Sequence, residues 1–116
     1  RYCIENRAAD MTMNVYLAFA MTLSAAVEGI KGKIHPGKPT DQDLYEMSEN
    51  EFKKLGIKRL PRNLLMAIEA LKKDRLSDDV LGPVMKKSFL AYKNDEWERY
   101  HQSVTDWEVK EYLRLY

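Results

Sequence analysis

The segment from Val15 to Ile30 constrains the fold most, because apolar side chains recur along it at helical spacing with almost no polar stripe. One face carries apolar residues three or four positions apart, namely Tyr16, Phe19, Ala20, Leu23, Val27 and Ile30. The other face holds Leu17, Ala18, Met21 and Ala25. A helix that is apolar on most sides is typically buried within a larger body. The sequence therefore predicts a core helix here, with Asp10 or Asn14 as its N-cap.

Residues 1–7 predict a short strand ahead of that helix. The period of two places Cys3, Glu5 and Arg7 on one face of an extended segment. A carboxylate and a guanidinium on one face suit a site that holds a hard cation through oxygen and a phosphate or carboxylate through a planar fork of N–H donors. The more common alternative for an acid and a base two residues apart is a solvated face with a marginal ion pair.

This strand has no evident partner, because the apolar spacing beyond Val15 is three to four residues instead of two. A lone strand leaves its backbone N–H and C=O groups unpaired. We therefore expect residues 1–116 to be a piece of a longer polypeptide that holds the rest of the sheet. The expected fold class is mainly α with one N-terminal strand.

Two capping boxes predict two short helices. Ser48 and Glu51 have the Ser-x-x-Glu spacing, and Gly56 is the type of residue that ends a helix. Thr105 and Glu108 repeat the spacing before the last helix.

Residues that commonly begin or end helices predict the helices between these two boxes. Pro61 and Asn63 are expected to open a helix, and Ser77 is expected to restart the chain for one turn that ends at Gly82. Pro83 then begins the next helix, with a possible break at Asn94 and Asp95.

Composition excludes several classes of function. Nineteen basic and eighteen acidic residues are spread along the chain, so no nucleic-acid partner is expected. The single cysteine forms no internal disulfide, and no signal peptide or membrane span is evident, so the expected location is the cytoplasm and no membrane partner is expected. Neither His35 nor His101 has ligands at metal spacing, and both are interpreted as ordinary loop and helix residues.

Several strings in one order carry a resemblance to a known family. They are IENRAAD, then Asn14, then YLAFA, EGIKGKIHPGKP and LYEM. This order resembles the C-terminal part of the glutamine synthetase catalytic domain, whose members carry ExRxxD, NPYLA, GIKxKI and LYE. The later strings LGIKRLP, EALKK and EWERYHQSVTDWE resemble the form common in Gram-positive bacteria and archaea. The resemblance covers essentially all 116 residues and implies the helical part of an α+β catalytic domain.

The resemblance implies an ATP-dependent ligase that joins ammonia to glutamate through a γ-glutamyl phosphate, with Mg²⁺ or Mn²⁺ at the site. Glu5 matches a metal ligand near the nucleotide phosphates. Arg7 matches a catalytic and substrate-binding arginine at the reacting carboxyl and phosphoryl oxygens. No residue for binding the nucleotide itself is assigned, and the other site residues are expected upstream, so the fragment alone is expected to be inactive.

Three positions depart from the family's pattern. Cys3 stands where most members carry an arginine that helps to hold the nucleotide phosphates, although Arg1 could take over part of that role. Met11 and Val15 stand where the family's two prolines normally lie, so entry into the helix is expected to be less rigid.

The resemblance also implies assembly into a homo-oligomer, a dodecamer of two stacked rings, with residues 112–116 at an interface. Two alternatives stay open. One is a ligase that attaches methylamine or a polyamine to glutamate. The other is a non-catalytic helical interaction module, which the presence of both Glu5 and Arg7 disfavours.

Overall fold

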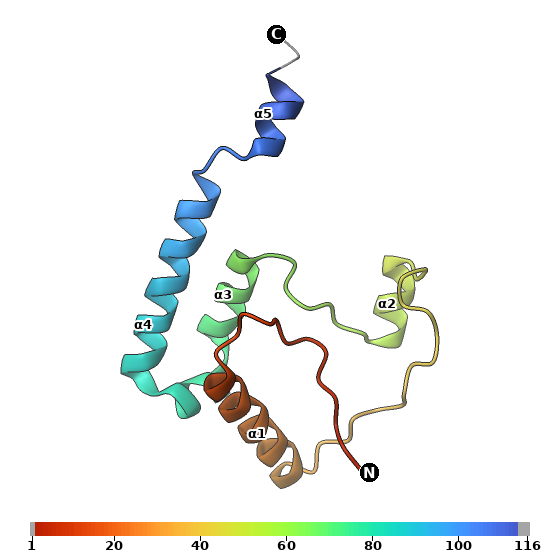
Figure 1. Cartoon of the computed structure of the whole chain (residues 1–116). Coiled ribbons are helices and arrows are strands. Elements are labelled where there is room, and N and C mark those ends of the chain that lie inside the picture. The colour runs from red at the N-terminus through yellow and green to blue at the C-terminus, as the bar shows by residue number, and fades with distance from the viewer. Residues whose placement is uncertain (1, 114–116) are drawn as a thin grey trace. The chain divides into compact units, whose positions relative to one another are not determined.

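The computed structural model describes residues 2–113, which form helices joined by irregular segments (Figure 1). The elements are α1 (Val15–Lys31), α2 (Glu49–Leu55), α3 (Leu64–Lys73), α4 (Arg75–His101) and α5 (Asp106–Tyr112). The mainly helical fold class is therefore confirmed. The chain divides into two compact units, one of residues 1–59 and 75–80 and the other of residues 60–74 and 81–116.

The predicted N-terminal strand is not confirmed, because no strand is present within residues 2–113. A β-ladder needs a second strand to receive its hydrogen bonds, and the described part of the chain offers none. Local turns take the place of a ladder after Arg7. The amide of Ala8, for example, donates to Oδ1 of Asn6 at 3.0 Å.

The predicted helix from Val15 is confirmed as α1, and its burial within a larger body stays a prediction. Asn14 is the N-cap, since its Oδ1 accepts from the Leu17 amide at 3.2 Å. No residue of α1 is buried, and Phe19 and Leu23 are 69% and 68% exposed. The described residues therefore leave one apolar face of this helix uncovered.

Both predicted capping boxes are confirmed. In α2, Oγ of Ser48 accepts from the Glu51 amide at 3.4 Å, and Oε2 of Glu51 accepts from the Ser48 amide at 2.7 Å. The equivalent distances for Thr105 and Glu108 at α5 are 3.2 Å and 2.8 Å. Gly56 ends α2 in the left-handed conformation, with φ of 68°.

In the second unit, a lysine of α4 closes the end of α3. Asn63 begins α3 by accepting from the Met66 amide at 2.9 Å. At the other end, Nζ of Lys86 donates to the backbone oxygen of Asp74 at 2.9 Å and to that of Lys72 at 3.5 Å. Lys86 is only 6% exposed. A buried cation thus meets the carbonyl end of α3, where the helix dipole favours positive charge.

The start of α4 differs from the prediction. The helix begins at Arg75, and Ser77, which was expected to restart the chain, is fully buried inside its first turns. Gly82 then leaves helical geometry with φ of 69° and ψ of 166°, and Pro83 follows as predicted. The pair of residues that interrupts the helix was therefore identified correctly, but the start of the preceding segment was not.

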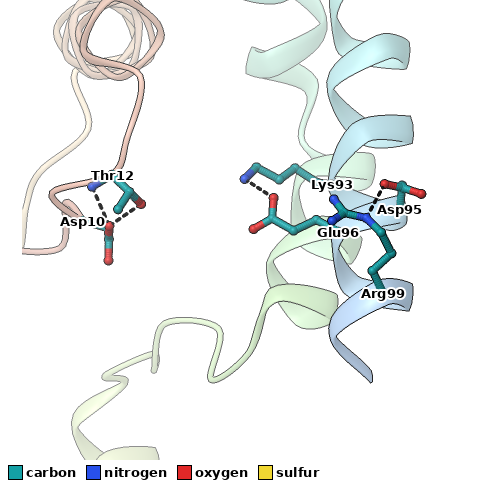
Figure 2. Close-up of polar contacts among 6 residues, drawn as sticks. All are labelled: Asp10, Thr12, Lys93, Asp95, Glu96 and Arg99. Carbon is teal, nitrogen blue, oxygen red and sulfur yellow. Dashed lines mark hydrogen bonds and ion pairs between the residues drawn. The ribbon is translucent and has the colours of Figure 1, made fainter. Parts of the chain in front are cut away.

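The possible break at Asn94 and Asp95 is wrong, because α4 continues to His101. Nδ2 of Asn94 donates to the backbone oxygen of Leu90 one turn earlier, at 2.7 Å. Two ion pairs on the same stretch also span a helical turn (Figure 2), namely Lys93 with Glu96 at 2.6 Å and Arg99 with Asp95 at 2.8 Å. These contacts stabilise the helix across Asn94 and Asp95, two residue types that otherwise favour a helix end.

Two apolar side chains are buried among residues 2–113, one in each unit. Phe52 of α2 is 7% exposed, with the guanidinium of Arg59 lying 4.1 Å above its ring and paired with Glu49 at 3.3 Å. Ile68 of α3 is 3% exposed.

None of the helices in the described range has the length and apolar content that a membrane span requires.

Candidate functional site

The structure brings Glu5 and Arg7 together even though it forms no strand there. Nε of Arg7 donates to Oε1 of Glu5 at 2.8 Å, and Nη2 reaches Oε2 at 3.4 Å. The guanidinium fork therefore faces both oxygens of one carboxylate, which is the geometry this group uses for planar anions. The residues predicted for the site are neighbours with complementary charge.

This pair is open to exchange with other partners. The side chains of Arg7 and Glu5 are 84% and 69% exposed. Exposed pairs of this kind contribute about 0 to 1 kcal/mol to stability, so little holds the two groups to each other. A substrate anion could take the place of Glu5 on Arg7, and a cation could take the place of Arg7 on Glu5.

Glu5 fits a hard cation as one oxygen donor among several. Mg²⁺ prefers about six oxygen ligands, including waters and substrate phosphates, and is commonly held by one or two carboxylates. Within residues 2–113 no group of three or more acidic, histidine or cysteine side chains is close enough to hold a metal. The described chain therefore supplies at most a part of such a site, through the Glu5 carboxylate.

Asp10 organises the turn between Arg7 and α1. Its Oδ1 accepts from the Thr12 amide at 2.7 Å and from the Thr12 hydroxyl at 2.6 Å (Figure 2). The Met13 amide also donates to the Asp10 backbone oxygen at 3.1 Å. The hydroxyl and then the amide of Thr12 lower the pKa of Asp10 from its usual 3.8.

Sequence reasoning missed this turn, because it treated Asp10 as an alternative N-cap for α1. Asn14 takes that role in the structure. The signal available in the sequence was the Asp-x-Thr spacing, since aspartate commonly accepts from the amide two residues ahead.

The remaining sequence candidates lie outside this turn. Cys3 is an exposed free thiol, and Arg1 lies outside the described residues. Nδ1 of His35 accepts from the Gly37 amide at 3.0 Å, which makes it a loop residue as interpreted. His101 stacks on Trp97 with ring centroids 5.4 Å apart.

The predicted interface segment is described only in part. Tyr112 makes an edge-to-face contact with Trp107 within α5, at 5.9 Å between centroids. Residues 114–116 lie outside the described residues.

Comparison with known families gives the context of this site. The family model described as "Glutamine synthetase, catalytic domain" matches residues 1–112. The chain belongs to the glutamine synthetase family. Glu5, Arg7, Asp10 and Thr12 all lie inside the matched range.

Individual members of the family show how similar the chain is to named enzymes. It is 38% identical over 112 residues to a glutamine synthetase from Methanococcus maripaludis and 41% identical over 110 residues to one from Methanocaldococcus jannaschii. It is also 41% identical over 113 residues to a protein named glutamate–methylamine ligase from Methyloversatilis universalis. These matches cover 95 to 97% of the chain. The chain spans about a quarter of the length of these relatives.

Proposed function

We propose that residues 1–116 form the C-terminal part of the catalytic domain of an ATP-dependent ligase that joins ammonia to glutamate. The observation that carries the proposal is the pairing of Glu5 with Arg7 inside a chain that matches the glutamine synthetase catalytic domain along its length. The pair brings together a carboxylate that suits a divalent cation and a planar guanidinium that suits the reacting carboxyl and phosphoryl oxygens.

In the proposed reaction, the γ-carboxylate of glutamate attacks the γ-phosphorus of ATP, and the bond to the ADP oxygen breaks. Ammonia then attacks the carbonyl carbon of the resulting γ-glutamyl phosphate, phosphate leaves, and the nitrogen loses a proton. Negative charge passes over the transferring phosphoryl oxygens in the first step and accumulates on phosphate in the second. A fixed positive charge beside these oxygens therefore lowers both barriers.

Arg7 is the proposed source of that charge. Its guanidinium presents parallel N–H donors, as it does toward Glu5 at 2.8 Å and 3.4 Å. A reacting carboxylate or phosphoryl group offers the same two-oxygen edge. Arg7 would then orient the acceptor carboxylate and stabilise the charge that develops on it.

Glu5 is the proposed ligand for a divalent cation. Mg²⁺ or Mn²⁺ would neutralise charge on the phosphate oxygens of ATP. The Glu5 carboxylate would supply one anionic oxygen to that cation, in the place that the Arg7 guanidinium takes in the structure. The remaining ligands are proposed to lie in the part of the enzyme outside this chain.

The identity of the amine has a second candidate. A relative named glutamate–methylamine ligase is 41% identical to this chain, the same identity as the glutamine synthetase from Methanocaldococcus jannaschii. The resemblance to this relative supports methylamine as an alternative nucleophile. Nothing in the first step changes, because the amine enters only after phosphoryl transfer.

We further propose that the complete enzyme is a cytoplasmic homo-oligomer, a dodecamer as in the family. Exposed apolar and aromatic side chains on α5 support a role for this helix in subunit contacts, since Trp107 is 62% and Tyr112 is 54% exposed. Size measurement on the purified enzyme tests this assembly.

The test is phosphate release by the complete enzyme with ATP, Mg²⁺, glutamate and either ammonium or methylamine. We expect release that depends on all components, and the amine that gives the higher kcat/KM is the substrate. Arg7→Lys keeps the charge but loses the fork, so kcat should fall by about a hundredfold to a thousandfold with little change in the KM for ATP. A near-normal kcat would remove Arg7 from the reaction, and no release with any amine would favour the non-catalytic module.

A further inference from the structure

The connection from Arg7 to α1 is held by side chains instead of proline rings. Met11 and Val15 leave the backbone of this segment without the fixed φ that proline imposes. Instead, the Oδ1 atoms of Asn6, Asp10 and Asn14 each accept a hydrogen bond from a backbone amide two or three residues ahead, at 3.0 Å, 2.7 Å and 3.2 Å. Of the three, Asp10 alone accepts a second bond, from the Thr12 hydroxyl at 2.6 Å.

The turn at Asp10 is the midpoint of this connection. Arg7 lies three residues before Asp10, and α1 begins five residues after it. The backbone bond from Met13 to Asp10 at 3.1 Å closes the same turn. The path between the arginine and the helix is therefore restricted at one place by three hydrogen bonds that converge on Asp10.

We propose that Asp10 and Thr12 are positioning residues, which fix the place of the Arg7 guanidinium relative to α1 by holding this turn in one conformation. The inference rests on the proposed function of Arg7 and extends it to two residues that touch no reactant. A guanidinium acts on a reacting group only from the correct distance and angle, and a displacement of about 1 Å can cost about a hundredfold in rate. A loosened turn spreads Arg7 over several positions and lowers the fraction of correctly placed arginines.

The test uses three variants of the turn in the complete enzyme. Asp10→Ala removes both side-chain bonds, Thr12→Val removes only the hydroxyl, and Thr12→Ser keeps both. The matched control is Asp43→Ala, because Oδ1 of Asp43 accepts from the amide of Tyr45 at 2.9 Å in another exposed turn. Asp43→Ala removes one side-chain bond of the same kind from a turn that is distant from Arg7 in the sequence.

We expect kcat to fall by about tenfold in Asp10→Ala and by about threefold in Thr12→Val, within the range that misplacement of a catalytic group produces. The KM for ATP should stay within about twofold, since the contact belongs mainly to the transition state. Thr12→Ser and Asp43→Ala should resemble the wild type. Amide hydrogen exchange in residues 8–13 should speed up in Asp10→Ala and stay unchanged in Asp43→Ala.

A double-mutant cycle with Arg7→Lys separates positioning from general stability. If Asp10 acts through Arg7, Asp10→Ala should cause no further loss of kcat once Arg7 is lysine. Independent, multiplicative losses in the double variant, or an equal loss in Asp43→Ala, would overturn the inference and leave the role of Arg7 intact. A near-normal kcat in Arg7→Lys alone would instead overturn the proposed function, and the inference with it.

Discussion

Replacing Lys86 with methionine should weaken the packing of α4 against the end of α3. Methionine keeps a flexible apolar stem of similar length but removes the charge and the donors. The hydrogen bond from Nζ of Lys86 to the backbone oxygen of Asp74, at 2.9 Å, is charge-assisted and is worth about 1.5 to 3 kcal/mol. The contact with the backbone oxygen of Lys72, at 3.5 Å, lies at the limit of hydrogen bonding and adds little. Because Lys86 is 6% exposed, water cannot readily replace it at the carbonyl. We therefore expect Lys86→Met to lower the free energy of unfolding by about 2 kcal/mol.

Native-state hydrogen exchange of the complete protein measures this loss locally, at the amides of α3 and of α4 after Pro83. The control is Lys87→Met, because Lys87 is the exposed neighbour of Lys86 on the same helix and should change stability by less than about 0.5 kcal/mol. Equal effects of the two substitutions, or a loss at Lys86 below about 0.5 kcal/mol, would refute the view that a buried cation closes α3.

Three further outcomes are expected. The Ser48 hydroxyl and then its amide lower the pKa of Glu51 from its usual 4.5, so these contacts stabilise α2 above pH 4.5 and are lost as the pH falls through the lowered pKa. Protection of the α2 amides, taken relative to their intrinsic exchange rate, should fall with acid, and Ser48→Ala should weaken that dependence. Phe19→Ala should cost about 2 to 5 kcal/mol in denaturant unfolding of the complete enzyme if its other parts cover α1, and a loss below about 1 kcal/mol would mean that this face stays at the surface. Gly82→Ala should destabilise α4 by about 1 to 3 kcal/mol in the same measurement, because φ of 69° with ψ of 166° is a conformation for glycine, and an unchanged stability would show that the backbone relaxes there.

The starts of most helices could be predicted because their signals are local. A cap or capping box acts over three residues, so Asn14, Ser48, Asn63 and Thr105 could be identified without knowledge of what the helices pack against. The end of α2 at Gly56 is equally local.

Features that depend on distant partners could not be predicted in the same way. The apolar period of α1 identified a helix, but periodicity cannot say whether a covering layer is present in the same stretch of chain. The strand at residues 1–7 needs a second strand to exist at all. Ser77 was misread because a serine that favours a helix start also tolerates burial inside one when its hydroxyl has a partner.

The candidate site was predicted in composition and only partly in geometry. A period of two placed Glu5 beside Arg7, and the side chains meet although the backbone is irregular, because complementary charges two residues apart can reach each other in several conformations. Asp10 was assigned to a cap, since a short acidic side chain before a helix suits either a cap or a turn. The bond to the Thr12 hydroxyl distinguishes the two roles, and it is visible only in three dimensions.

The capping boxes of α2 and α5 have a consequence for the register of these helices. Each helix has seven residues, which is too short to persist on its own in water, so both need neighbours for stability. Their first turns are nevertheless fixed by contacts that span three residues, and such contacts close far faster than any long-range packing. Substitutions elsewhere in the protein can therefore change how often α2 and α5 are formed while the residue at which each begins stays the same.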